Sequence, residues 1–322
     1  MARGAVPPSP LPPRHGVDAQ RIRMPQEGPW ATLRDHLVER LAVGLSAAEV
    51  DRKLAAGEFV DVAGRAVRPD APFVPRDVVW THRDLPDLPD LPDLPDGPGG
   101  PGGTGMDQPE IVVLHRDDRI VVIDKPHDVA TMPRGQHVVQ SALARTRVLT
   151  GLTRLAPAHR LDRPTAGVLM FTTEQRWRGA YQGVFASGLA HKEYLAVAPV
   201  RDGLTLPLVR RSHLVKEHGV HQAREVAGAE PNAETLVALE ARRGDVGGYR
   251  LTPRTGRTHQ LRCQLAGLGI PIVGDPLYPL EREPVTGEVP LQLLAAVLEF
   301  DDPVDGSRRR FETGRHLAAW PG

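Results

Sequence analysis

One carboxylate, Asp162, stands between two arginines, Arg160 and Arg163, within residues 159–167. An arginine beside a carboxylate favours its ionised form, so we expect Asp162 to be charged at neutral pH. An ionised carboxylate can act as a nucleophile or as a base. The alternative interpretation is a structural ion pair at a strand end, because the apolar residues 168–171 that follow indicate a buried strand.

Other segments carry further candidate groups. Lys192 and Tyr194 lie close together, and residues 255–262 contain Arg257, His259, Gln260 and Arg262. The formal net charge is zero, so total charge indicates no partner. The distribution of charge is more informative. Residues 145–192 are rich in arginine and contain few acids, and residues 250–262 contain arginines but no acid. Two basic segments fit a local anionic partner such as a phosphate backbone, and the alternative is two solvated faces.

The elements that must position these groups are strands with few helices. Residues 111–114 and 119–124 alternate like two strands around an Asp117-Asp118 turn. Apolar residues from 177 to 185 recur with the helical period, and the helix is expected to end at Gly188. The patterns predict further strands at 194–200, 233–239 and 249–252, and a helix at 259–268 that stops at Gly269. This content indicates an α+β fold.

Composition divides the chain into four regions. Residues 1–29 are rich in proline and are expected to be a disordered tail. Residues 30–83 predict a small domain of two capped helices and a short hairpin over residues 59–67, similar to a small RNA-binding module first known from a ribosomal protein; a generic helical cap is the alternative. Residues 84–106 repeat Asp-Leu-Pro and then become glycine-rich, which is typical of a linker. Residues 107–322 are expected to be the catalytic domain.

Several classes of protein are disfavoured by composition. The single cysteine, Cys263, excludes an internal disulfide and a multi-cysteine metal site. No apolar run approaches the ~20 residues of a membrane span, which leads us to expect a cytoplasmic protein without a membrane partner. His213, His218 and His221 raise the alternative of a metal hydrolase, but their spacing suits no common helical zinc site and is typical of a variable loop.

Four segments in this order closely resemble the RluA-type pseudouridine synthases. They are residues 117–126, residues 159–167, residues 192–197 and residues 255–262 with 269–278. The resemblance covers roughly residues 110–300. It implies an isomerase that converts uridine in RNA to pseudouridine without a metal or other cofactor. It also implies a long mixed, largely antiparallel sheet with a central catalytic cleft.

The resemblance assigns roles to individual residues. Asp162 matches the catalytic aspartate, and Arg160 matches the arginine that helps to hold the RNA open. Tyr194 matches the tyrosine that stacks on the target base, and Arg262 matches the arginine that pairs with the aspartate. Lys125, Arg163, Lys192, Arg257, His259 and Gln260 are the residues that we expect to contact RNA.

Two departures from the family pattern bear on these expectations. Thr165-Ala166-Gly167 replaces the usual Thr-Ser-Gly, and His127-Asp128-Val129 replaces Ser-Gly-Leu after Lys125-Pro126. The second puts substrate choice in question. We expect a monomer that acts on ribosomal RNA, with transfer RNA as the other substrate class. A catalytically silent RNA-binding or ribosome-assembly factor is the alternative function, and whether Asp162 attacks the sugar or the base is left open.

Overall fold

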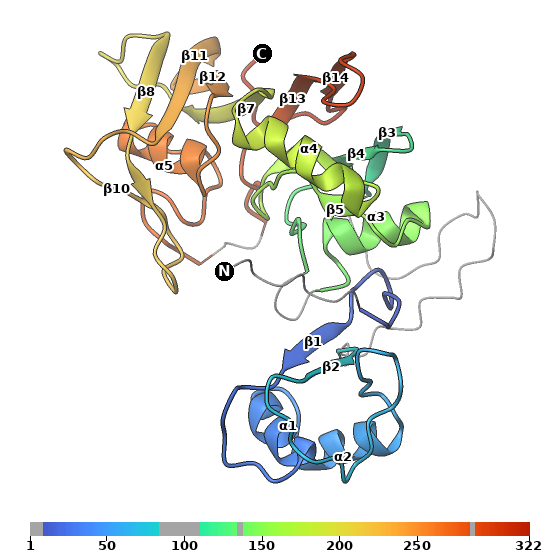
Figure 1. The fold of residues 1–322 in the computed structure, drawn as a ribbon. Coiled ribbons are helices and arrows are strands. Elements are labelled where there is room, and N and C mark those ends of the chain that lie inside the picture. Colours follow the sequence, from blue (N-terminus) through green and yellow to red (C-terminus); the bar gives the residue numbers. More distant parts are fainter. Residues whose placement is uncertain (1–8, 84–109, 134–137, 284–286) are drawn as a thin grey trace. The chain divides into compact units, whose positions relative to one another are not determined.

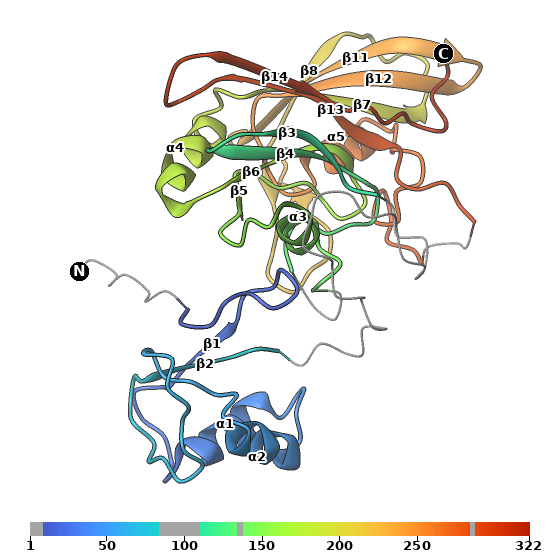
Figure 2. The same ribbon diagram turned by 90° about the vertical axis from the view of Figure 1, so that its right-hand side faces the viewer.

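The structure, a computed structural model, describes residues 9–83, 110–133, 138–283 and 287–322. The chain divides into two compact units, Met1–Asp96 and Gly97–Gly322, each with its own apolar core. Figures 1 and 2 show the elements of each unit from two sides. The expected linker at residues 84–106 lies outside the described residues.

The first unit contains two short helices and two paired strands. In chain order these are β1 (Gln20–Arg23), α1 (Leu33–Leu41), α2 (Ala47–Ala55) and β2 (Val78–Thr81). Thr32 caps α1 and Ser46 caps α2, each in a reciprocal capping box with the acid three residues on. The helices bury one apolar face each against the strands, in a core of Ile22, Met24, Leu33, Leu37, Val50, Leu54, Phe59 and Val79. The two predicted helices are therefore present.

Two expectations for this region are wrong. The segment expected to be a disordered tail contains β1, which pairs antiparallel with β2. Ile22 and Met24 lie in the core, and this short apolar alternation was obscured by the proline-rich composition around it. The expected hairpin over residues 59–67 is a turn with a single bridge between Val60 and Ala66, because Val60 also bridges to Trp80 of β2. The main strand pair is thus formed by distant segments.

The second unit is built on one sheet of ten strands. Its strands are β3 (Val112–Arg116), β4 (Ile120–Lys125), β5 (Ala156–Pro157), β6 (Ala166–Thr172), β7 (His191–Pro199), β8 (Leu208–Ser212), β11 (Ala233–Arg243), β12 (Val246–Pro253), β13 (Leu293–Asp301) and β14 (Arg308–Glu312). The order is β3-β4-β6-β13-β7-β12-β11-β8, with β14 beside β13 and β5 beside β6. Every pair is antiparallel except β6 with β13. The smaller pair β9 (Leu214–Val215) and β10 (Arg224–Glu225) stands apart from this sheet. The expected mixed, largely antiparallel α+β fold is confirmed.

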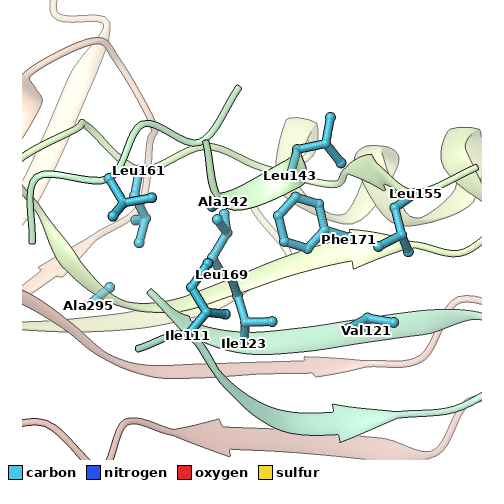
Figure 3. Packing of buried hydrophobic residues seen from close by; sticks show 11 residues of the cluster. Ile111, Val121, Ile123, Ala142, Leu143, Leu155, Leu161, Leu169, Phe171 and Ala295 are labelled. Carbon is cyan, nitrogen blue, oxygen red and sulfur yellow. The ribbon is translucent and has the colours of Figure 1, made fainter. Parts of the chain in front are cut away.

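Helices cover the two faces of the sheet around β6. Leu169 and Phe171 pack with α3 (Ala142–Thr150), as Figure 3 shows, whereas Val168 and Met170 pack with α4 (Gln175–Ala186). Alternate side chains of a strand point to opposite faces, so a strand covered on both faces is apolar throughout. This explains the apolar run that follows Asp162 in the sequence.

The junction of β6, β13 and β7 brings distant parts of the chain together. Ala295 of β13 lies opposite Gly167 of β6 on one side and opposite Tyr194 of β7 on the other. A Cβ on Gly167, whose φ is +110°, would lie 2.2 Å from the carbonyl oxygen of Ala295, so only glycine permits this approach. The loop before β6 is thereby held near Tyr194. Beyond β7, α5 (Gln260–Gly267) packs on β7, β11 and β12.

Candidate active site

A cavity of about 760 Å³ opens on the second unit, beside the junction of β6, β13 and β7. Its walls are residues 157–162, the end of α4 with residues 185–188, Lys192 and Tyr194 of β7, and residues 253–262. Three of the four segments singled out in the sequence therefore meet around one space. Its volume lies within the range of ~300–1,000 Å³ that is usual for ligand pockets.

Asp162 lies in the cavity wall on a loop that is fixed from both sides. The preceding residue, Leu161, is buried in the core that contains α3, and its backbone N–H and C=O both bond the hydroxyl of Thr131, at 3.1 and 2.8 Å. On the other side, the N–H of Thr165 donates to the carbonyl of Asp162 itself. The carboxylate remains 27% exposed. It is thus accessible on a loop whose backbone is held in place.

Arg262 is the buried cation next to this carboxylate. Its Nη1 donates to Oδ2 of Asp162 at 3.3 Å, which places the expected pair in the structure. Its Nε and Nη2 donate to the two oxygens of Asp275 at 2.8 and 2.6 Å. Burial lowers the pKa of the Arg262 guanidinium, but its hydrogen bonds to Asp275 and the charges of both carboxylates outweigh this and raise the pKa overall. Arg262 is therefore a permanent cation with two acidic partners.

His259 faces the same carboxylate from the residue before α5. Its Nε2 lies 4.0 Å from Oδ1 of Asp162, and its Nδ1 lies 3.2 Å from the hydroxyl of Tyr278. Burial lowers the pKa of His259 below its usual value, although the charge of Asp162 acts in the opposite direction. Asp162 thus has the guanidinium of Arg262 near one oxygen and an imidazole near the other.

Tyr194 lies in the cavity wall between the two apolar cores on either side of it. Burial, and then the charge of Asp162, raise the pKa of its phenol. The ring therefore stays neutral and presents an aromatic surface close to the carboxylate. A flat ring at the wall of an open cavity is suited to stack on a nucleobase.

Some of the residues that we expected to contact RNA line the cavity, and others do not. Arg160 and Arg257 are exposed at the cavity, where they can meet a phosphate. Lys192 also lines it and donates to the carbonyl of Thr255 at 3.2 Å, and burial lowers its pKa. Arg163 is exposed but does not line the cavity, and its Nε donates to the carbonyl of Asp128.

Two of those assignments are wrong. Lys125 is fully buried, and its Nζ donates to the carbonyls of Pro126, Val129 and Arg163 at 2.7–3.0 Å, so it cannot reach RNA. Burial lowers the pKa of Lys125 to about 7. Its role is to join the end of β4 to the loop of Asp162. An ammonium with three donors fits three carbonyl groups, and the motif position alone did not reveal this.

Gln260 is the second wrong assignment, since its amide is occupied within the protein. Its oxygen accepts from the Thr255 hydroxyl and the Arg257 N–H, and its nitrogen donates to Glu234 and Thr235. The side chain is 4% exposed. Gln260 therefore shapes the loop that carries Arg257.

Asp275 is the residue that reasoning from the sequence missed. It lies in residues 269–278, a segment that was identified without a role for this acid. The available signal was the chemistry of Arg262, because a guanidinium has five donors and a single carboxylate such as Asp162 satisfies only some of them. Thr131, which fixes Leu161, had no signal in the sequence.

The histidine cluster of the alternative metal site does not assemble. His213 bonds the carbonyl of Glu230 and His221 bonds Glu281. Within the part of the chain that the structure describes, no group of three or more histidine, cysteine, aspartate or glutamate side chains could hold a metal ion. Among the same described residues, no helix is both long enough and apolar enough to cross a membrane.

Comparisons with known proteins point in the same direction as this geometry. A family described as RNA pseudouridylate synthase matches residues 119–267. The dual-specificity RNA pseudouridine synthase RluA of Vibrio cholerae is 31% identical over 206 residues, which cover 61% of this chain and 79% of that protein. The enzyme of the same name from Pasteurella multocida is 31% identical over 184 residues, which cover 53% of this chain and 78% of the relative.

A third relative and one solved structure extend the comparison. The ribosomal large subunit pseudouridine synthase D of Pseudomonas aeruginosa is 25% identical over 233 residues, covering 63% of this chain and 68% of that protein. The structure of human RNA Pseudouridylate Synthase Domain Containing 1 superposes with a TM-score of 0.52 at 22% identity. It covers 67% of this chain and 86% of the human chain, and this likeness concerns the fold.

Proposed function

The chain belongs to the RluA-type RNA pseudouridine synthases, and from that premise we propose that it modifies uridines in ribosomal RNA with Asp162 as the catalytic carboxylate. The observation that carries the proposal is one cavity in which Asp162, Arg262 and Tyr194 meet. These residues come from a loop, a helix and a strand that are far apart in the sequence. A purely structural ion pair would not need to open on a cavity of this size.

The reaction requires a reactive group that can reach a single nucleotide. The N1–C1′ bond of uridine must break, the uracil must turn, and a new bond must form from C5 to C1′. A carboxylate can open this sequence by attack on the sugar or on the base, provided that it is ionised. Arg262, held by Asp275, keeps a positive charge beside Asp162.

The target base must leave the RNA stack before Asp162 can reach it. Flipping a nucleotide costs a few kcal/mol. Stacking on an aromatic ring offsets about 1–3 kcal/mol per base, and Tyr194 presents such a ring at the cavity wall. Arg160, Arg257 and Lys192 border the cavity and supply cations for the phosphates that flank the flipped nucleotide.

Ribosomal RNA is the favoured substrate class. The support is the relative whose name specifies the large ribosomal subunit, at 25% identity. Two relatives carry the name dual-specificity RNA pseudouridine synthase, and transfer RNA is the second candidate substrate class here. His127-Asp128-Val129 lies beside the loop of Asp162, where Nδ1 of His127 bonds the carbonyl of Pro164 at 2.8 Å. We take this segment as a place where substrate choice is set.

The test is conversion of ribosomal RNA taken from cells that lack this protein. The full chain should create new pseudouridines, mapped by carbodiimide labelling and reverse transcription, and Asp162→Asn should create none while it still binds RNA. Asp118→Asn is the matched control, because Asp118 is an exposed acid outside the cavity. Turnover by Asp162→Asn within tenfold of the wild type would refute the role of this carboxylate. New sites in transfer RNA alone would refute the substrate class.

A further inference from the structure

His259 occupies an unusual backbone position at the edge of the cavity. It is the residue before α5, and its φ of 55° lies in the left-handed region, which residues other than glycine adopt uncommonly, although asparagine, aspartate and histidine are enriched there. Its side chain makes no capping hydrogen bond to the helix. It turns instead toward Asp162 and is 13% exposed. Strained backbone of this kind is typical of functional positions, where the surroundings hold it in place.

The hydrogen bonds of Tyr278 determine which nitrogen of His259 carries the proton. The Tyr278 hydroxyl donates to the carbonyl of Ala223 at 2.9 Å and accepts from the N–H of Ala223 at 2.6 Å. A phenol has one hydrogen, so none remains for Nδ1 of His259, 3.2 Å away. Nδ1 must therefore be the donor in that contact. In the neutral imidazole, Nε2, which lies 4.0 Å from Oδ1 of Asp162, is then unprotonated.

Burial keeps His259 neutral, and the acidic groups that face it leave it able to accept a proton. Burial lowers its pKa, as do Arg262 of α5 and Lys216 of the loop after β9. Asp162 and Asp275 act in the opposite direction, so a proton gained at Nε2 would be stabilised by the carboxylate 4.0 Å away.

Neither of two other groups at the cavity wall is available in the same way. The pKa of Tyr194 is raised by burial and by Asp162, which makes its neutral phenol a poor acceptor. His159 has its Nε2 engaged by the N–H of Met170 at 3.1 Å, and burial lowers its pKa to about 3. His259 is therefore the neutral base with an unoccupied nitrogen beside the carboxylate.

We propose that Nε2 of His259 removes the C5 proton in the last step of the reaction, an assignment that rests on the pseudouridine synthase function. Once C5 has bonded to C1′, C5 carries both the sugar and a hydrogen, and N1 is joined to C6 by a double bond. Nε2 takes the hydrogen as a proton, and the C5–H electron pair becomes the C5=C6 double bond. The π pair of N1=C6 moves to N1, which takes a proton and becomes the N1–H of pseudouridine. One proton moves from C5 to N1 overall, and no oxidant or reductant is consumed.

The test compares RNA transcripts with hydrogen or deuterium at C5 of uridine, in single turnovers of the wild type and of His259→Asn. Asparagine tolerates the left-handed backbone, so the variant is expected to fold, which circular dichroism checks. Loss of a general base typically slows a reaction by ~10²–10⁴-fold. We expect a decrease of this order, together with a hydrogen-to-deuterium rate ratio well above that of the wild type, because C5–H cleavage becomes the slowest step. In His259→Gly, added imidazole should restore part of the rate and lower that ratio.

A structural role for His259 would give a different result. The variant would then be slow with the isotope ratio of the wild type and without rescue by imidazole, and either a result of this kind or an unchanged rate would overturn the proposal. The transcript is one that the wild type modifies. Failure of the proposed function would appear as absence of turnover by the wild type, and failure of the His259 assignment would appear only in the variants.

Discussion

Arg262 engages Asp275 through two hydrogen bonds, from Nε at 2.8 Å and from Nη2 at 2.6 Å, and offers only Nη1 to Asp162. Asp275 is fully buried and also accepts from the backbone N–H groups of Leu277 and Tyr278. The acid outside the cavity therefore holds the arginine more closely than the acid inside it. The position of the charge beside Asp162 depends on a residue that lies outside the cavity.

Asp275→Asn should remove most activity and lower stability, although Asp275 lies outside the cavity. Breaking a buried ion pair typically costs ~3–5 kcal/mol, because the remaining charge is left uncompensated. Urea unfolding and single-turnover rates measure the two effects. Asp301→Asn is the control, since its pair with Arg308 is exposed and such pairs contribute at most ~1 kcal/mol. Normal stability and turnover of Asp275→Asn would show that Arg262 needs only Asp162.

Tyr194→Phe should retain most activity, whereas Tyr194→Leu should lose ~1–3 kcal/mol of stacking energy, which is about 5- to 150-fold in kcat/KM. The reason is that the phenol is neutral and its ring, rather than its hydroxyl, is expected to support the flipped base. Steady-state kinetics on a short RNA distinguishes the two variants. Equal and normal rates would refute stacking, and a large loss in Tyr194→Phe would give the hydroxyl a role in the chemistry.

Lys125→Met should change the pH dependence of stability. The pKa of Lys125 is lowered from 10.5 to about 7 in the folded protein. Between these values the unfolded chain binds a proton that the folded chain does not, so the free energy of unfolding rises with pH, by ~1.4 kcal/mol per unit at most. The methionine variant lacks this increase.

Urea unfolding at a series of pH values from about 6 to about 9 tests this expectation. The stability of the wild type relative to Lys125→Met should be level below about pH 7 and should increase above it. Lys216→Met, which removes an exposed lysine, is the control variant. A wild-type advantage that decreases as the pH rises would contradict the lowered pKa.

Deletion of residues 1–105 should leave a folded protein that still modifies short RNA at high concentration. None of the cavity residues lies in this region, and the first unit has its own core. If residues 30–83 contact RNA, affinity for long RNA should fall and its salt dependence should become shallower, because phosphate contacts are lost. Binding titrations at several salt concentrations measure both. An insoluble product would place the boundary elsewhere, and unchanged affinity would remove the RNA-binding role of this unit.

Most of the secondary structure could be predicted because its signals are local. The apolar period of α4, the capping boxes of Thr32 and Ser46, and the Asp117-Asp118 turn between β3 and β4 all lie within a few residues of the elements that they determine. The strand β1 was missed because its four residues lie in a proline-rich segment and are stabilised by β2, which follows at a distance of more than fifty residues. Short strands of this kind depend on their partner.

The sequence by itself identified the family and the candidate residues Asp162, Tyr194 and Arg262, because these residues occur in motifs that follow one another in a fixed order. Tertiary structure alone decided how they act together. Only the insertion of β13 between β6 and β7 places the loop of Asp162 beside Tyr194. Only packing shows that Lys125 is buried and that Asp275 holds Arg262. The physical reason is that ionisation, burial and hydrogen-bond pairing depend on neighbours that are distant in sequence, and a motif specifies residue types without specifying those neighbours.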